Sequence, residues 1–402
     1  MAAGLAGSLA CASASPPPGG PEDRNPPQLL AVIPDSNAVN FDEPNVVFQF
    51  DETINNRGGG AQELDNYFLV SPSDGNPRVS WHRSRIDVRP RNGFRDNTAY
   101  TVTLLPGLTD LRGNVTRSGA SVVFSTGPTI PPGRITGTVF DWVAERPAAR
   151  ALLQAVTPDS VVYLAQADSL GRFTLGPLPN GSYLVQAIVD ANNNRALDRS
   201  ESFDTVRVLV PQAAPVELLA ATRDTLPPRI LSVTPVDSLS LRVTFDRFLD
   251  PAAPPSARAL RLVASDSTPI PLVAVLTPRA EQAEAQARQQ AVTDSIRRAD
   301  SLAGKPILPP SLANAAARRT PTGPTPSVPP PYTALLLRLA RPLAHDAIYR
   351  LSVTDARGLS GRSQSSERSF TTPRAPPPRP PADSTRRTPT PAPAAAPPAP
   401  RP

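Results

Sequence analysis

Apolar and polar residues alternate in short runs along most of the chain, and segments rich in Gly, Pro, Asn and Asp separate these runs. An alternation of period two predicts β-strands with one buried face. Within residues 25–128 the pattern predicts strands at 29–33, 46–50, 67–71, 79–81, 85–88, 100–104 and 121–124. Trp81 and Phe94 are the candidate core aromatics of this part. We therefore expect residues 25–128 to be an all-β domain.

The opening of this domain recurs near residue 227. The segment PPQLLAVIP at 26–34 is matched by PPRILSVTP at 227–235. Both copies continue to a strand that ends in Phe-Asp, and both close with a Tyr-led strand and a last strand that ends in Phe-Ser-Thr or Phe-Thr-Thr. A unit repeated at this distance is a domain, and about seven short strands in roughly 100 residues are typical of an immunoglobulin-like sandwich. The chain is therefore expected to hold two such sandwiches, at 25–128 and 226–373.

Residues 132–220 form a β-unit with a different pattern. Strands are predicted at 134–140 and 161–165, and a G-x-F-x-L run is followed by P-x-G-x-Y-x-V-x-A. These two runs predict consecutive strands joined by a tight turn, a hairpin that buries Phe173, Leu175, Tyr183 and Val185 on one face. The chain thus has a third sandwich between the two copies.

The second copy is interrupted at 277–330. Residues 279–302 are rich in Ala, Gln, Glu and Arg and carry only Val292, Ile296 and Leu302 as large apolar groups, which predicts a solvated helix with a weak stripe. Residues 306–331 are rich in Pro, Ala and Thr and are expected to be unstructured. The strand at 334–339 then resumes the sandwich. Beyond it, 374–402 is expected to be a disordered tail of polyproline type.

Composition and charge narrow the function. The chain carries 53 prolines in 402 residues and a formal net charge of +6. After Pro373, five arginines against one aspartate place +4 of this charge in the tail. The rest of the chain is nearly neutral with mixed signs, so nucleic acid is not the expected partner. With no run of 18 apolar residues, the sequence predicts no membrane-spanning helix.

A single cysteine, Cys11, excludes an internal disulfide and a zinc cluster of cysteines. It follows a small-residue apolar stretch and precedes a Pro/Gly tether, so residues 1–24 resemble the end of a bacterial lipoprotein signal and its linker. This resemblance implies that Cys11 is acylated and becomes the first residue of the mature chain. The alternative is a disordered alanine-rich N-terminus with an incidental thiol.

Several of these features together resemble a known family. Cys11, the tether, Pro26-Pro27, Phe50-Asp51-Glu52 and Phe124-Ser125-Thr126-Gly127 resemble bacterial Ig-like domain lipoproteins, in which an SbsA-type Ig-like domain follows the acylated cysteine. The segment from Gly133 to about Val210 resembles the carboxypeptidase-regulatory-like, or prealbumin-like, β-sandwich found next to it. The resemblance implies an exported, outer-membrane-attached and non-catalytic protein. Its fold would be all-β: tandem Ig-like sandwiches, a central prealbumin-like sandwich, one helical and disordered insertion, and disordered Pro-rich termini.

One loop has the spacing of a calcium site. Taken as a twelve-residue loop, 190–201 has side-chain oxygens at positions 1, 3, 5, 9 and 12 and a backbone carbonyl at position 7. Position 6 is usually Gly because the chain turns sharply there, and here it is Arg195, at a cost of about 1–2 kcal/mol. The alternative is a long turn in which Asp and Asn side chains cap their own backbone. The candidate ligands are Asp190, Asn192, Asn194, Ala196, Asp198 and Glu201.

Other chemistry lacks its minimum parts. The two histidines, His82 and His345, lie in different modules, which argues against a zinc site. The sequence has no G-x-S-x-G and no phosphate loop. Asp51-Glu52 and Asp246 follow matching strands of the two copies, which favours a structural role over a catalytic one. The remaining polar motifs therefore predict no enzyme.

Two functions remain open. The first is a non-catalytic cell-envelope lipoprotein with a structural, adhesive or assembly role, whose partners are envelope proteins and, through the lipid, the membrane. The second is a module that binds envelope or extracellular polysaccharide. It would need exposed aromatics, and Tyr100, Tyr163, Tyr183, Tyr349 and Trp142 are the candidates. Most of them lie on alternating strands, which favours core packing.

Overall fold

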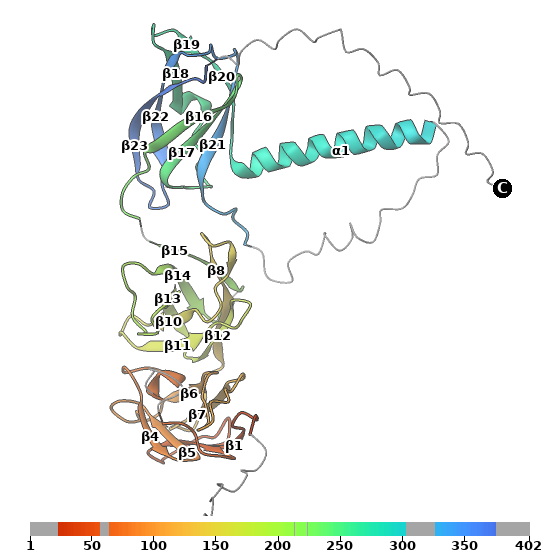
Figure 1. The fold of residues 1–402 in the computed structure, drawn as a ribbon. Helices are drawn as coiled ribbons and strands as arrows, with labels where there is room; N and C mark the ends of the chain where they lie inside the picture. The colour runs from red at the N-terminus through yellow and green to blue at the C-terminus, as the bar shows by residue number, and fades with distance from the viewer. Residues whose placement is uncertain (1–22, 57–63, 213, 223, 303–325, 375–402) are drawn as a thin grey trace, which may run out of the picture. The chain divides into compact units, whose positions relative to one another are not determined.

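The computed structural model describes residues 23–56, 64–212, 214–222, 224–302 and 326–374 (Figure 1). The chain divides into two compact units, one of residues 1–225 with 306–331 and the other of 226–305 with 332–402. Within the described ranges the structure is built of β-strands and a single α-helix, which confirms the all-β class. The predictions for Cys11, for 303–325 and for the tail from 375 onward lie outside the described residues.

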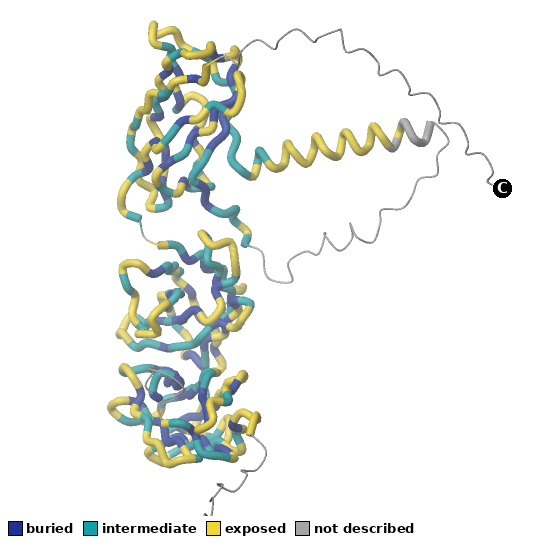
Figure 2. The backbone as a smooth tube through the Cα atoms, in the orientation of Figure 1, coloured by how far each residue is buried: buried dark blue, intermediate teal, exposed yellow. Residues whose placement is uncertain are grey.

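The first sandwich has two sheets. One has the strand order β1-β2-β5-β4 and the other β3-β6-β7. Their bounds are β1 Leu29–Ile33, β2 Val46–Phe50, β3 Phe68–Ser71, β4 Arg78–His82, β5 Arg85–Arg89, β6 Ala99–Leu104 and β7 Ala120–Ser125, and a 3₁₀ turn, η1, spans Leu64–Tyr67. The predicted strands agree with these bounds to within one residue at each end. Strand β2 shows why, because Val46, Phe48 and Phe50 are buried while the residues between them are half-buried. Figure 2 shows buried stretches interspersed with half-buried and exposed ones along the backbone of the sandwiches.

The two candidate core aromatics of this sandwich behave differently. Phe94 packs edge-on against Tyr100 and Phe124, with ring centroids 4.9 and 5.4 Å away. Trp81 is not a core residue: it is 37% exposed on edge strand β4, although its cross-strand partner Ile86 is fully buried. Its indole Nε1 donates a hydrogen bond to the carbonyl of Ile54 at 2.8 Å. Trp81 is therefore held at the surface by its polar atom rather than by burial.

The last sandwich repeats the strand order of the first. Its sheets run β16-β17-β21-β20 and β19-β18-β22-β23. The bounds are β16 Ile230–Asp237, β17 Ser240–Leu249, β18 Leu260–Ala264, β19 Pro269–Ile270, β20 Leu272–Leu276, β21 Tyr332–Leu339, β22 Ile348–Arg357 and β23 Ser363–Thr371. The insertion leaves after β20 and returns at β21. In the first sandwich the corresponding strands β4 and β5 are joined by a tight turn at Arg83, whose φ is +63°.

Equivalent polar contacts recur in the two copies. The hydroxyl of Tyr100 accepts a hydrogen bond from Arg95 N at 2.8 Å, and that of Tyr349 accepts one from Ala344 N at 2.9 Å. Each tyrosine thus packs its ring in the core and ties the preceding loop with its hydroxyl. The sequence repeat therefore corresponds to a repeated set of interactions as well as a repeated strand order.

Asp51 and Asp246 make equivalent contacts with the backbone in the two copies. Asp51 Oδ1 accepts a hydrogen bond from Gln28 N at 2.8 Å, and Asp246 Oδ1 accepts one from Arg229 N at 2.7 Å. Asp51 directly follows β2 and Asp246 lies within β17, and each carboxylate joins its strand to the residue just before the neighbouring strand. An aspartate is needed here because it reaches an otherwise unpaired amide at the sheet edge.

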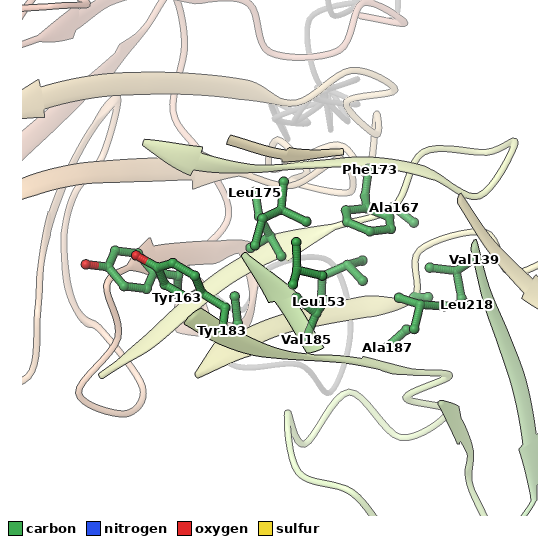
Figure 3. Close-up of a cluster of buried hydrophobic side chains, with 14 of the residues drawn as sticks. Val139, Leu153, Tyr163, Ala167, Phe173, Leu175, Tyr183, Val185, Ala187 and Leu218 are labelled. Carbon is green, nitrogen blue, oxygen red and sulfur yellow. The ribbon is translucent and has the colours of Figure 1, made fainter. Parts of the chain in front are cut away.

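The middle sandwich lies in the first unit with the first sandwich. Its strand path is β11-β10-β13-β14-β15-β8-β12, and a two-residue strand, β9 Arg146–Pro147, pairs with β8. The other bounds are β8 Gly133–Asp141, β10 Leu152–Val156, β11 Val162–Gln166, β12 Arg172–Leu178, β13 Gly181–Ile188, β14 Ser202–Val210 and β15 Val216–Thr222. Only two residue pairs join β14 to β15, so the path folds over at this corner and the two halves enclose the core (Figure 3).

The expected hairpin between β12 and β13 is wrong. Strand β12 pairs with β8, whereas β13 pairs with β10 and β14, so the two strands belong to opposite halves of the sandwich. The four predicted core residues are buried nonetheless: Phe173, Leu175, Tyr183 and Val185. Strands on opposite halves point alternate side chains into the same core, so a period-two pattern does not distinguish them from a hairpin.

Helix α1, Pro278–Leu302, matches the predicted helix. Its first turns contact the last sandwich through two ion pairs, Glu281–Arg242 at 2.8 Å and Glu284–Arg338 at 3.3 Å. Further along, Val292 is 58% exposed. Among the described residues no helix combines the length and hydropathy that a bilayer crossing needs.

Candidate functional site

The loop at 190–201 connects β13 to β14 and is closed by its own polar side chains. The carboxylate of Asp190 accepts hydrogen bonds from Asn194 N at 3.2 Å and Arg195 N at 2.9 Å. The side-chain amides of Asn192 and Asn194 both donate to Asp198 Oδ2, at 2.8 and 3.0 Å. These contacts pull residues at positions 1, 3, 5 and 9 of the loop towards one another.

Glu201, at position 12, braces the two ends of the loop. Its side chain is buried, with 6% of its surface exposed. One carboxylate oxygen accepts Ala191 N and the other accepts Asp198 N, both at 3.0 Å. A buried carboxylate with two amide donors is well compensated. Glu201 therefore holds the start and the end of the loop together.

The candidate ligand atoms of the loop are carboxylate, amide and backbone oxygens, which are the kinds of ligand that calcium prefers. In the arrangement described, most of these oxygens accept hydrogen bonds from loop amides, as in the long capped turn that the sequence also allows. Each carboxylate oxygen keeps a second lone pair, and a half-turn of the two Asn amides would direct their oxygens towards Asp198. The residue types suit the ion, but among the described residues the carboxylates that converge within 4.8 Å are those of Asp23, Glu52 and Asp110, so calcium binding by this loop stays a prediction.

Arg195, at position 6, has a backbone φ of +60°, the left-handed conformation that this position requires. Its side chain leaves the loop and reaches the first sandwich. The guanidinium Nη2 donates to Asp65 O at 3.0 Å and to Phe68 O at 2.9 Å, at the end of turn η1. Arg195 therefore links the middle sandwich to the first, a role that sequence reasoning missed.

Burial and the nearby charges have opposite effects on the pKa of the Arg195 guanidinium. Burial lowers the pKa of the guanidinium, while the carboxylates of Asp65 and Asp190 raise it. Asp65 Oδ1 is buried and has no hydrogen-bond partner. The guanidinium of Arg195 interacts favourably with the carboxylate of Asp65, which offsets part of the cost of burying that oxygen.

Backbone pairing continues across the same junction. Ser73 N donates to Val162 O at 2.7 Å, and Leu164 N donates to Ser71 Oγ at 2.9 Å, which joins the end of β3 to β11. On the neighbouring strand β6, Thr101 Oγ1 donates to Gly176 O at 2.9 Å. The junction is thus an extended polar seam as well as a single arginine contact.

An apolar cluster completes the junction. Its buried members are Leu69 of the first sandwich and Leu152 and Ile188 of the middle one, each at most 4% exposed. Half-buried Leu105, Leu164 and Phe203 pack against them. Apolar burial on this scale contributes about 1.5–3 kcal/mol for each fully buried side chain. The loop at 190–201 therefore lies beside a small core shared by the two sandwiches.

A second acidic group lies elsewhere in the first sandwich and was not predicted. Three carboxylate oxygens lie within 4.8 Å of one another, one each from Asp23, Glu52 and Asp110. Burial raises the pKa of Glu52, and the nearby carboxylates of Asp110, Asp23 and Asp51 raise it further. Burial opposes ionisation of Asp110, but hydrogen bonds from Asn114, Arg112 and Gly113 outweigh it and lower its pKa. These residues come from three separate segments, so no local motif signals them.

The other candidates do not come together in the described residues. His82 Nε2 lies 3.7 Å from Asp87 Oδ2 and His345 Nδ1 lies 3.2 Å from Pro373 O, in different sandwiches. The tyrosines considered for a sugar platform are buried in their cores, as favoured: Tyr100, Tyr163, Tyr183 and Tyr349. Trp142 is half-buried, and its indole Nε1 donates to Pro329 O at 3.0 Å.

The last sandwich carries a hollow on its surface. It has a volume of about 450 Å³ and is lined by residues 253–256, Ala259 and parts of β22 and β23. Asp355 and Arg357 are the charged members of its described lining. A lone carboxylate beside a guanidinium has no partner with which to share acid and base roles, so this hollow does not resemble a catalytic site.

Comparisons with known proteins give a partial assignment. No curated protein matches the sequence. Among solved structures, the S-layer protein rSbsC(31-844) aligns at 11% identity over 87% of this chain and 41% of that one, with a TM-score of 0.19. The Bacillus anthracis TIE protein aligns at 14% identity over 60% of this chain and 47% of that one, with a TM-score of 0.18. The chain thus spans about half the length of these proteins or less, and TM-scores this low carry no argument about its function. A family model gives the firm result: residues 23–126 are a bacterial Ig-like domain.

Proposed function

We propose that the protein is a non-catalytic component of the bacterial cell envelope, in which the first two β-sandwiches act as one stiff body with a structural or adhesive role. The observation that carries this proposal is the junction at Arg195, where hydrogen bonds, strand pairing and an apolar cluster join the two sandwiches. A flexible linker would have sufficed to connect two independent domains. The contacts present here favour transmission of position and force from one sandwich to the next.

The use of the charged residues supports the same proposal. Asp51, Asp246 and Glu201 each accept backbone amides that would otherwise lack a partner. The alternate side chains of each sandwich fill its core rather than line a cleft. Groups that satisfy the backbone in this way are committed to stability, which leaves little for acid–base chemistry.

Attachment through Cys11 is the second part of the proposal. Acylation of Cys11 would anchor the mature chain to the outer membrane and leave residues 12–24 as its tether. We expect the Cys11→Ser protein, expressed with its full leader, to leave the membrane fraction. Retention of this variant in the membrane fraction would count against the lipid anchor.

The partners are proposed to be envelope proteins. Crosslinking in the native cell, followed by mass spectrometry, tests this directly, and we expect crosslinks from the exposed faces of the sandwiches to envelope proteins. Recovery of cytoplasmic proteins alone would contradict the proposal. Glycan binding is the second candidate, but burial of the four tyrosines removes most of the aromatic platform that it would use.

Calcium binding by the 190–201 loop is proposed as a stabilising feature. Asp198 is the most informative ligand to change, because its Oδ2 accepts hydrogen bonds from the side-chain amides of Asn192 and Asn194. We expect millimolar calcium to raise the melting temperature of the wild type but not of Asp198→Asn, with magnesium as the control ion. A wild-type melting temperature that does not respond to calcium refutes this part.

A further inference from the structure

Trp142 and Glu217 present polar atoms on two adjacent strands of the middle sandwich, where Glu217 pairs with Thr138, four residues before Trp142. Trp142 directly follows β8, and Glu217 lies on β15, which pairs with β8 in parallel. Trp142 N donates to Ala220 O at 2.9 Å, so the two strands stay in register as far as the tryptophan. The indole and the carboxylate are therefore positioned by regular strand pairing rather than by a loose loop.

A distant part of the chain lies against these two side chains. The segment 326–331 directly precedes β21 and belongs to the first compact unit together with Trp142 and Glu217. Ser327 N donates to Glu217 Oε1 at 2.9 Å and to Oε2 at 3.2 Å, and the Ser327 hydroxyl also donates to Oε2. Trp142 Nε1 donates to Pro329 O at 3.0 Å. The first contact spans 110 positions of sequence and the second 187.

The chemistry of this segment explains the two contacts. Ser327 is followed by Val328-Pro329-Pro330-Pro331. Proline has no backbone N–H, so its carbonyl is the polar group through which a proline run can be held, and an indole N–H is a suitable donor. Ser327 contributes the donors that the prolines lack. Val328, Pro329 and Pro330 are half-buried and Pro331 is buried, so the run is packed rather than solvated.

We propose that Trp142 and Glu217 form a binding site for a serine-led, proline-rich segment, and that residues 327–331 occupy it as an internal ligand. Recognition of extended proline-rich segments by an aromatic side chain with a polar donor is a general mode of peptide binding. Here it would attach the returning arm of the insertion to the middle sandwich.

The two tryptophans of the chain, Trp81 and Trp142, make a direct test practicable. Full-length protein labelled with 5-fluorotryptophan has two ¹⁹F signals, which Trp81→Phe assigns. We expect Ser327→Asp, which sets a negative charge against Glu217, to shift the Trp142 signal. The control is Ser365→Asp, which makes the same charge change at an exposed serine of β23 and should leave the signal in place.

A peptide supplied in solution completes the test. The probe is the synthetic peptide TPSVPPP, which copies residues 325–331, at concentrations on the order of millimolar to match a tethered ligand. In Ser327→Asp protein we expect it to return the Trp142 signal towards its wild-type position, while a TPDVPPP peptide does not. An unchanged Trp142 signal in Ser327→Asp, or failure of TPSVPPP to return it, overturns the proposal.

Discussion

Replacement of Arg195 by Ala is expected to weaken the junction between the first two sandwiches. The substitution removes two hydrogen bonds from a charged donor, to Asp65 O and Phe68 O. Hydrogen bonds of charged groups contribute about 1.5–3 kcal/mol each, and these two share one guanidinium, so they do not add fully. The loss also removes the favourable charge interaction between the guanidinium and the carboxylate of Asp65. We expect the free energy of unfolding of the first unit to fall by about 2–4 kcal/mol.

Two further variants separate this loss from backbone strain. Arg195→Gly removes the same hydrogen bonds but relieves the left-handed conformation, so it should be less destabilising than Arg195→Ala by about 1 kcal/mol. Arg150 is the matched control, because it has the same φ of +60° and an exposed side chain. Arg150→Gly should leave stability within about 1 kcal/mol of the wild type.

Scanning calorimetry of the full chain measures the effect. For a unit of this size about 1 kcal/mol corresponds to 2–4 °C, so Arg195→Ala should lower the transition of the first unit by roughly 5–15 °C. Hydrogen exchange should also accelerate at turn η1, Leu64–Tyr67, where the guanidinium is lost. A transition in Arg195→Ala within about 2 °C of that in Arg150→Gly, with unchanged exchange at η1, would refute the reasoning.

Two predictions concern titrating groups. Burial and the neighbouring carboxylates raise the pKa of Glu52 in the folded protein, so folding favours its protonated form. The protonated side chain therefore contributes to the free energy of unfolding below its unfolded-state pKa, and this contribution is lost as pH rises through its folded-state pKa. Glu52→Gln should therefore raise stability at neutral pH, measured by denaturant unfolding, and a decrease would show that the charge is needed. Burial raises the pKa of Tyr183 to about 12. Its contribution is present below the unfolded value of about 10 and is lost between pH 10 and 12. Absorbance titration of wild type against Tyr183→Phe should locate one tyrosine ionising in that upper range, and a difference that titrates near pH 10 would contradict it.

The fold was largely predictable because its strands alternate strictly. In β2, Val46, Phe48 and Phe50 face the core, and this pattern determines both the strand and its buried face. The pairing of β12 was not predictable in the same way. Phe173 on β12 and Tyr183 on β13 point into one core from opposite halves, and alternation reports burial but not the partner strand.

The candidate site was predictable only where its contacts are local. The spacing from Asp190 to Glu201 predicted a polar loop that either binds calcium or caps its own backbone, and Arg195 stood out as the residue that departs from the expected Gly. The partners of Arg195, however, are backbone carbonyls about 130 positions away, and a carbonyl has no sequence signature. The contact between Trp142 and Pro329 was hidden for the same reason.

Stiff coupling of the first two sandwiches is the central claim, and a distance distribution between them tests it most directly. Nitroxide labels at the exposed positions Ser80 and Arg207, one on each sandwich, can be introduced by cysteine substitution in a Cys11→Ser chain. Double electron–electron resonance should give a single narrow distribution in this background and a broader one when Arg195→Ala is added. A broad or multimodal distribution with Arg195 intact would contradict the account.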